Sequence, residues 1–198
     1  YSMTLGAWAL LLAVAGGIAI GSYAALRQTS FVDYAVMTIA SFGITVPNFV
    51  LAPILSFVFA VVLRWLPAGG WGDGGVADLL LPVISLGLPQ LAVFARITRG
   101  SMIETLRADH IRTARAYGLP TRVVVIVHAM RAALVPAVSY LGPVAAAVLT
   151  GSVVVETVFG LPGVGRYFVL GALNRDYTLV MGTVVLISVF IVVFNHLV

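Results

Sequence analysis

The chain has 198 residues, of which 61% are hydrophobic and only 9% are charged. Ordinary soluble domains carry roughly 25% charged residues, so this composition excludes a water-soluble globular protein and indicates a polytopic membrane protein. Cysteine is absent, and His110, His128 and His196 are too scattered to indicate a metal cluster. The net charge of +4 comes from arginines beside apolar spans, which is typical of cytoplasmic retention. We therefore predict no metal and no nucleic-acid partner.

The first predicted span covers residues 5–26, a run of 22 uncharged residues. A helix of about 20 apolar residues is long enough to cross the hydrocarbon core of a bilayer. Ala13, Gly17 and Gly21 repeat along it at a spacing of four. This spacing either lets another helix approach closely or only reflects the frequency of glycine in membrane helices, and the sequence does not decide between the two.

The second predicted span, residues 34–63, contains no charge over 30 residues. A straight helix of that length would measure about 45 Å, longer than the bilayer core is thick, so the span must tilt, bend or begin outside the membrane. Pro47 and Pro53 are the expected bends. Pro47 and Asn48 are candidates for a pathway lining, although an ordinary kinked helix is the simpler interpretation.

Residues 79–97, 132–156 and 177–198 supply three further predicted spans. Together the five spans indicate an all-α membrane protein that forms a single domain over residues 1–198. The midplanes of all five spans are uncharged, which is unfavourable for an ion channel or an ion-coupled secondary transporter.

Glu156 ends the fourth span and precedes a stretch that is too interrupted to cross the membrane and too apolar for a solvated loop. We expect this stretch to be a partly embedded or interfacial excursion over the outer mouth of the pathway. Glu156 is a candidate for the outer gate, although a structural ion pair with Arg166 or Arg175, or a solvated interfacial position, is favoured. The other outer-gate candidates form a predicted turn at Pro162, Gly163 and Gly165.

Seven of the eleven arginines lie between residues 96 and 131, in the only long polar interruption of the chain. We predict that residues 98–131 form a cytoplasmic loop. Eight arginines, including Arg27, lie on this side of the predicted spans and three on the other, and arginine-rich loops stay in the cytoplasm. This topology places Tyr1 outside, so we expect a further span in front of it.

The predicted loop contains the signals of a short helix over residues 110–117. Asp109 is a good N-cap and forms an (i, i+3) pair with Arg112. Gly118 and Pro120 are a stop signal, because glycine tolerates the left-handed conformation after a helix and proline cannot continue it. A helix of about 12 Å is unstable alone, so we expect it to pack against another protein.

A helical wheel places the apolar and charged residues of this region on different faces. Glu104, Arg112 and Arg115 lie opposite the apolar face. Such a pattern fits a helix that docks on a partner and equally a helix that rests on the membrane surface. The residues of the predicted docking face are Ile103, Leu106, His110, Ala114 and Tyr117.

Catalytic signatures are missing from the sequence. None of the seven acidic residues pairs with another inside a span, and the sequence has neither a nucleophile elbow nor a zinc-protease motif. It also lacks a phosphate-binding loop, so ATP hydrolysis would have to occur on another subunit. His128 is interpreted as a hydrogen-bonded interfacial residue.

The segment DHIRTARAYGLPTRVVVIVHAMRAALVP, which starts at Asp109, resembles the cytoplasmic loop of bacterial ABC-importer permeases of the dipeptide and oligopeptide branch. The resemblance continues in ITVPNFVL (44–51), LPVISLGLPQLAVFARITRGSM (81–102), GSVVVETVFGLPGVGR (151–166) and NRDY (174–177). Tyr117 stands where the family usually has lysine, which leaves open whether an ionic contact forms there.

The resemblance implies a permease of the bacterial inner membrane with six helices, the first of which is missing from this sequence. Its implied partners are a second homologous permease, two cytosolic ATPase subunits that hold ATP and magnesium, and an extracytoplasmic solute-binding protein. Alternatives are a non-translocating membrane scaffold, or a permease for another solute such as haem or a nickel chelate. The implied ATPase-coupling residues are Asp109, His110, Arg112, Thr113, Ala114, Arg115, Ala116, Tyr117, Gly118 and Leu119.

Overall fold

The computed structural model describes residues 1–72, 74–149 and 153–197. The regular structure of these residues is entirely helical, which confirms the predicted all-α class. By length and composition the described residues contain four candidate membrane spans, or five if the bent pair Phe31–Thr45 and Asn48–Val62 is one span. The helices are α1 (Ser2–Leu26), α2 (Phe31–Thr45), α3 (Asn48–Ser56), π-helix η1 (Phe57–Val62), α4 (Val76–Leu106), α5 (Asp109–Ala116), α6 (Thr121–Val123), π-helix η2 (Val124–Ala129), α7 (Met130–Ala133), α8 (Val135–Leu149), α9 (Val153–Val158), α10 (Val164–Leu173) and α11 (Tyr177–Leu197).

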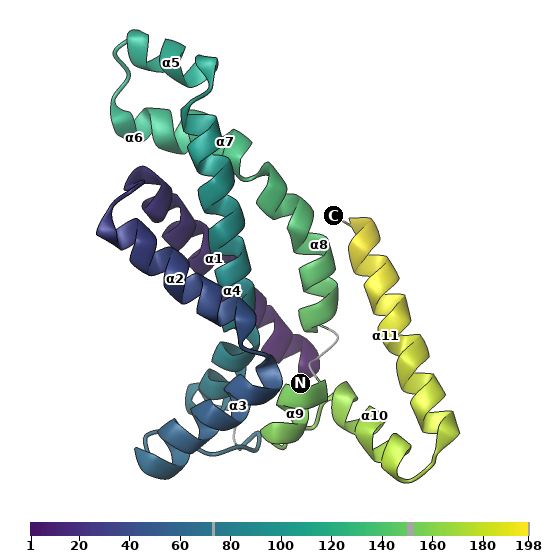
Figure 1. Cartoon of the computed structure of the whole chain (residues 1–198). Coiled ribbons are helices and arrows are strands. Elements are labelled where there is room, and N and C mark those ends of the chain that lie inside the picture. Colours follow the sequence, from purple (N-terminus) through teal and green to yellow (C-terminus); the bar gives the residue numbers. More distant parts are fainter. Residues whose placement is uncertain (73, 150–152, 198) are drawn as a thin grey trace.

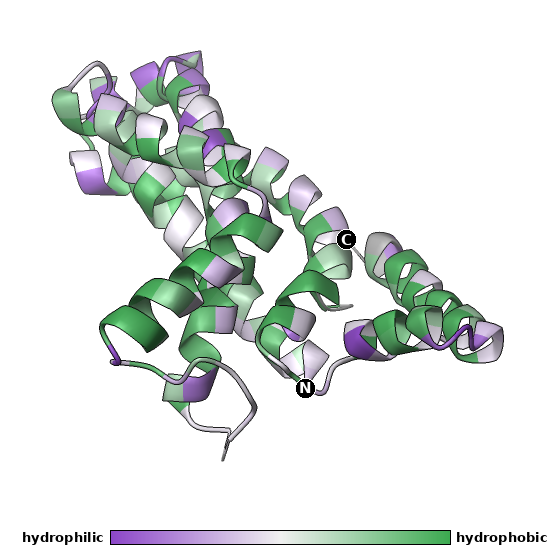
Figure 2. Ribbon diagram, turned by 60° about the horizontal axis from the view of Figure 1, so that its bottom comes forward, coloured by the Kyte–Doolittle hydropathy of each residue, from purple (hydrophilic) through white to green (hydrophobic). Residues whose placement is uncertain are grey.

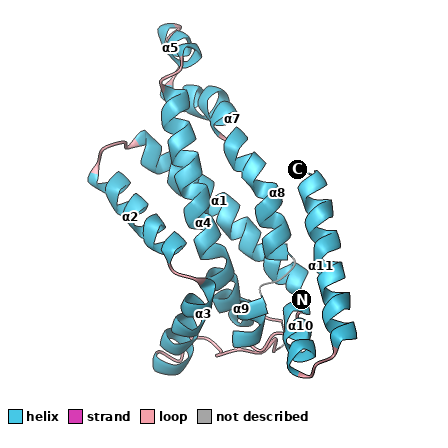
Figure 3. Cartoon of the chain, turned by 45° about the vertical axis from the view of Figure 1, so that its right-hand side comes forward, coloured by secondary structure: helices cyan, strands magenta, loops and turns pink. Residues whose placement is uncertain are grey.

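Helices α1 and α4 pack along each other through the centre of the molecule, with α2 on one side and α8 on the other (Figure 1). Helix α11 packs on α8 and is joined to the rest of the chain through α10. The short helices α5, α6 and α7 gather at one end, and α3, α9 and α10 lie at the opposite end (Figures 1 and 3). Hydrophobic residues dominate the long helices, while strongly hydrophilic ones concentrate at the α5 end and in loops (Figure 2).

The close contact between α1 and α4 depends on small residues. A Cβ atom on Gly17 would collide with the side chain of Phe94, and one on Gly21 would collide with the carbonyl oxygen of Ala95. Ala13, one turn earlier on the same face, is completely buried. The small residues at a spacing of four therefore form a face of α1 on which α4 packs. Of the two interpretations that the sequence left open, close helix packing is confirmed.

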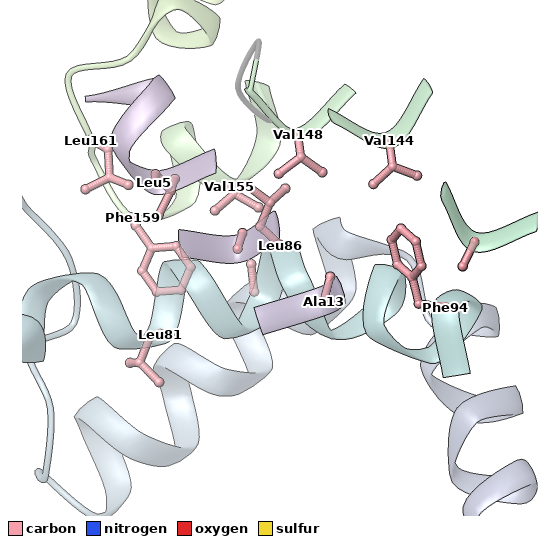
Figure 4. Packing of buried hydrophobic residues seen from close by; sticks show 13 residues of the cluster. Leu5, Ala13, Leu81, Leu86, Phe94, Val144, Val148, Val155, Phe159 and Leu161 are labelled. Carbon is pink, nitrogen blue, oxygen red and sulfur yellow. The ribbon is translucent and has the colours of Figure 1, made fainter. Parts of the chain in front are cut away.

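A buried apolar cluster joins α1, α4, α8 and the segment from Val155 to Leu161 (Figure 4). Phe94 of α4 lies beside Val144 of α8 at one end, and Phe159 lies near Leu81 at the other (Figure 4). Because lipid tails are as apolar as these side chains, dispersion contacts rather than release from water stabilise this packing.

The second predicted span is broken rather than continuous. Helices α2 and α3 are bent by 103° relative to each other. Val46 and Pro47 between them are extended, with ψ angles of 115° and 148°. Proline disfavours a helical conformation at the residue before it, which accounts for the break at Val46. Pro53 was the other expected bend, but it lies inside α3 without ending it.

The helix of the third predicted span is longer than the span itself. Helix α4 continues nine residues past residue 97 to Leu106 and therefore includes Arg99 and Glu104. The predicted loop 98–131 is accordingly helical in its first part. Charged residues ended the predicted span, whereas the helix continues because its backbone hydrogen bonds do not depend on hydropathy.

The fourth and fifth spans agree with expectation in part. Helix α8 begins at Val135 instead of residue 132, because Leu134 interrupts the helix before it. Residues 150–152 of the predicted fourth span lie outside the described residues, and α9 follows them. Helix α11 matches the fifth span. The predicted excursion after Glu156 contains a ten-residue helix, α10, which leads into α11 (Figure 1).

Candidate functional site

Helix α5 follows directly on α4 at the polar end of the molecule (Figure 3). Its N-cap is Ala108 and not Asp109 as predicted; Asp109 is the first helical residue and makes no side-chain capping bond. A carboxylate in the first turn still interacts favourably with the helix dipole. The predicted pair between Asp109 and Arg112 is confirmed, at 3.6 Å and exposed to solvent.

The C-terminus of α5 ends as the sequence predicts, although the helix runs from Asp109 to Ala116 instead of over residues 110–117. Gly118 has φ +74°, a left-handed conformation that favours glycine. Its N–H donates to the carbonyl of Arg115, and the N–H of Leu119 donates to that of Ala114. These two bonds form a Schellman motif, which satisfies carbonyls that would otherwise lack partners.

Two buried residues hold α5 against the rest of the chain. Ile111 and Ala114 belong to a second apolar cluster that includes Met102 of α4 and Val124 and Ala129 of η2. The short helix is therefore supported within its own chain, whereas the sequence analysis expected another protein to support it.

The predicted docking face of α5 is wrong in part. Ala114 is buried inside the chain, while His110 and Tyr117 are exposed, Tyr117 by 82%. The wheel treated residues 103–117 as one helix, but the chain leaves the helical path at Arg107 and Ala108, which changes the angular phase. The exposed residues of α5 and its C-terminal turn form the α5 surface: Asp109, His110, Arg112, Thr113, Arg115, Ala116, Tyr117, Gly118 and Leu119.

A partly buried ion pair joins the start of α2 to α4, and sequence reasoning missed it. Arg99 donates from Nε to Asp33 Oδ1 at 2.5 Å and from Nη2 to Asp33 Oδ2 at 2.6 Å. Asp33 is 1% exposed and also accepts from the N–H of Thr29 at 3.0 Å. The Ser30 hydroxyl caps the same end of α2 by accepting from the N–H of Asp33.

The sequence contained a signal for this pair. Both residues are charged and lie in helical continuations of apolar spans, where ionisable groups are costly unless they are paired. Arg99 was assigned to the predicted loop 98–131 and Asp33 lies just before the predicted span 34–63, so neither was considered as part of a helix. Nearby, Arg107 Nη2 donates to Gln28 Oε1 at 3.4 Å. The loop after α1 therefore lies beside the connection from α4 to α5.

Glu156 has a different environment from the one predicted. It is fully buried, forms none of the ion pairs among the described residues, and accepts a hydrogen bond from the N–H of Gly165 at 2.7 Å. Its carboxylate lies at the N-terminus of α10, where a negative charge is favourable. The expected solvated or ion-paired position is therefore wrong. Sequence reasoning failed because the partner is a backbone group that a turn brings back to Glu156.

The glycines of the outer turn make room for this carboxylate. A Cβ atom on Gly163 would collide with the Glu156 carboxyl group, and one on Gly165 would lie 2.8 Å from Glu156 Oε2. The N–H of Val164 donates to the hydroxyl of Ser2 on α1. The turn is thus fixed to both α9 and α1, with Pro162 half-buried within it.

The remaining pathway candidates lie at the bend of the second span. Pro47 is exposed and serves as the N-cap residue of α3, and Asn48 is the half-buried first residue of that helix. They are distant in sequence and in the fold from the α5 surface, which lies at the other end of the molecule (Figure 1). The structure therefore presents a polar surface at one end and a bend and fixed turn towards the other.

Comparisons with known proteins match nearly the whole chain. A family model described as "Binding-protein-dependent transport system inner membrane component" matches residues 17–198. The chain is 50% identical to the oligopeptide transport system permease protein OppB of Escherichia coli K12 over 187 residues, which cover 94% of this chain and 61% of that protein. Identity is 48% over 197 residues to OppB of Haemophilus influenzae, with 100% and 64% covered. It is 44% over 197 residues to the dipeptide transport system permease protein DppB of Bacillus subtilis, with 100% and 63% covered. The chain spans about three fifths of the length of these relatives.

Proposed function

The chain belongs to the family of binding-protein-dependent transport system inner membrane components, and from this we propose that it forms half of the membrane pathway of an ATP-driven peptide importer. The names of the relatives, oligopeptide and dipeptide permeases, support peptides as the cargo. The spanning helices supply the membrane-embedded part of such a complex.

The α5 surface is the observation that carries the proposal. Its residues are exposed, while Ile111 and Ala114 hold the helix on a packed apolar cluster continuous with α4 and η2. A surface that is polar outwards and rigidly supported inwards suits transmission of force from an ATPase subunit to the membrane helices. Tyr117 and Leu119 add exposed apolar area for such a contact.

The partners follow from the same assignment. The chain has no phosphate-binding loop, so two ATPase subunits on the cytoplasmic side would bind ATP and magnesium. A second homologous permease would complete the pathway, and a solute-binding protein would deliver the peptide from outside. Pro47 and Asn48 are proposed to lie along the pathway. The fixed turn at Pro162, Gly163 and Gly165, with Glu156 beneath it, is proposed as part of the outer gate.

A pair of single-cysteine variants tests the placement of the α5 surface. The natural chain has no cysteine, and Ala116 and Ala68 are both exposed at opposite ends of the molecule. In the complete complex, Ala116→Cys should cross-link to the ATPase and react only with reagents that reach the cytoplasm. Ala68→Cys should react from the outside and give no ATPase cross-link. Labelling of both from one side would overturn the orientation.

A matched pair of glycine variants tests coupling itself. Gly118 and Gly100 both have open space where a Cβ would lie, but only Gly118 has a positive φ. Gly118→Val should therefore strain the end of α5 by about 1 kcal/mol or more, and Gly100→Val should not. We expect Gly118→Val to assemble yet lose peptide transport and ATPase stimulation by loaded binding protein. Normal stimulation in both variants would return α5 to the role of a helix on the membrane surface.

One experiment distinguishes the peptide permease from the alternative functions. A membrane scaffold without a pathway would give no ATP-dependent uptake in vesicles reconstituted with all subunits. A permease for haem or a nickel chelate would take up those solutes and not peptides. Uptake of labelled di- and oligopeptides is the expected result.

A further inference from the structure

We propose that the ion pair between Asp33 and Arg99 transmits movement of α5 to the bend between α2 and α3. The inference rests on the proposed coupling function of α5 and names the residues through which that movement reaches a membrane-spanning segment. Asp33 and Arg99 are thereby positioning residues, which act on the pathway through the helices they join.

Helix α4 connects the pair to α5. It is continuous from Val76 to Leu106, and two residues, Arg107 and Ala108, separate it from α5. Arg99 lies seven residues before the end of α4, a distance of about 10 Å along the helix. Met102 of α4 packs in the same buried cluster as Ile111 of α5. A displacement of α5 therefore displaces the turn of α4 that carries Arg99.

The pair itself leaves little slack. Both nitrogens of Arg99 that face Asp33 are within 2.6 Å of separate carboxylate oxygens. A two-bond fork fixes the rotation of the two groups as well as their separation. Asp33 lies in the first turn of α2, and it is further tied to the turn before that helix: its carboxylate accepts from the Thr29 N–H, and its own N–H donates to the Ser30 hydroxyl. Movement of Arg99 is thus passed to the start of α2.

Beyond the pair, α2 meets α4 closely at Gly43, where an added Cβ would lie 3.2 Å from the Cβ of Ala92. An open apolar groove of about 380 Å³ flanks this contact and is lined among others by Ala40 of α2 and Leu88 of α4. Helix α2 packs mainly on α4 and less extensively on α1, and its outer face is exposed. The groove leaves α2 room to tilt about the contact at Gly43.

The far end of α2 is a hinge. Val46 and Pro47 have extended backbones, which ends α2, and α3 leaves at 103° to α2. A helix held at one end by an ion pair and jointed at the other is a lever, so a shift of Arg99 changes the angle of the bend. Pro47 and Asn48, the proposed pathway residues, lie at this bend.

Spin labels at Thr38 on α2 and Ile54 on α3 report the bend directly. Both positions are exposed, and in a straight helix they would be about 24 Å apart along the axis. In the complete complex in lipid, trapping the ATPases with ATP and vanadate should change the distance between the labels. Asp33→Asn should abolish this change and lower peptide transport by about tenfold or more, because Arg99 loses its partner. The control Arg96→Gln removes an exposed cation of α4 and should leave both the distance change and peptide transport at the wild-type level.

Three further measurements test whether the ion pair transmits movement or only supports the fold, and whether α5 still contacts the ATPase. Arg99→Lys keeps the charge but loses the two-bond fork; it should assemble normally and still lose about half or more of the distance change. The exchange Asp33→Arg with Arg99→Asp should recover part of the transport lost in Asp33→Asn. Cross-linking of Ala116→Cys to the ATPase should be unaffected in all of these variants.

Two results would overturn the proposal. One is a normal change of the label distance in the assembled Arg99→Lys complex, because the ion pair would then only support the fold. This result decides the question even if Asp33→Asn fails to assemble. The other is transport within about twofold of wild type in assembled Asp33→Asn. Loss of the Ala116 cross-link in the otherwise unaltered complex would instead overturn the proposed function of α5.

Discussion

Helix α4 and the α2–α3 segment make an instructive comparison, because each is long, apolar and interrupted by two prolines. Helix α4 contains Pro82 and Pro89 and remains one helix of 31 residues. The α2–α3 segment contains Pro47 and Pro53 and is bent by 103°. Proline content alone therefore does not decide whether a membrane helix breaks.

The difference lies in the surroundings of the two segments. Helix α4 packs against the glycine face of α1, where an added Cβ on Gly17 or Gly21 would collide with α4. On α2, Ile39 and Phe42 are 71% and 67% exposed. A proline is tolerated in a helix that neighbouring helices hold along its length, and it bends the chain where they do not.

The largest expected effect comes from removing the close packing that supports α4. Gly21→Leu places side-chain atoms against the carbonyl of Ala95 and should destabilise the protein by about 3 kcal/mol or more. Gly43→Leu on α2 is the control: its Cβ would lie 3.2 Å from Ala92 beside the open groove, so we expect less than about 1 kcal/mol. Thermal unfolding of the purified complex measures both. Equal losses would mean that α1 does not support α4 in this way.

A smaller effect is expected from the prolines themselves. Pro47→Ala restores an N–H and frees Val46 from the preference for extended backbone, so α2 and α3 should straighten. We expect a longer distance between labels at Thr38 and Ile54, and transport lowered by about tenfold. Pro89→Ala within the packed α4 should leave transport within about twofold of wild type. If Pro89→Ala were the more harmful change, the comparison between the two segments would fail.

The smallest effect is expected from two serine hydroxyl groups, one on α4 and one on α2, that donate to backbone carbonyls of their own helices. Ser85→Ala removes the buried bond to the carbonyl of Pro82 and should lower stability by about 0.5–1 kcal/mol. Ser41 on the exposed side of α2 makes a similar bond to the carbonyl of Met37, and Ser41→Ala should change stability by less than about 0.5 kcal/mol. Thermal midpoints of the two variants give the comparison, and a reversed order would contradict it.

Sequence reasoning located the spans because hydropathy and charge act locally. The first and fifth spans agree with α1 and α11 within a few residues. It found the end of α5 for a similar reason, since a positive φ at Gly118 depends on one residue and its neighbours. It did not show that α4 continues to Leu106, because charged side chains mark where a helix leaves the membrane and not where it stops.

The candidate site was predictable in position but not in orientation. The residues of α5 lie in the predicted loop, and His110 and Tyr117 of the predicted docking face are exposed, but Ala114 of that face is buried in the chain beside Ile111. This difference arises at Arg107 and Ala108, where a short break alters the phase of the following helix. A helical wheel cannot include such a break unless its place is known.

The sequence by itself determined the membrane class, the approximate spans and the short helix before Gly118, because each follows from a local property of adjacent residues. Tertiary structure alone decided the pairing of Asp33 with Arg99, the burial of Glu156 against the backbone of Gly165 and the outward face of α5. These features join residues that are apart in the chain, and their energies depend on which helices pack together. Composition and spacing carry no record of that packing, so the same prolines leave α4 intact and bend α2 away from α3.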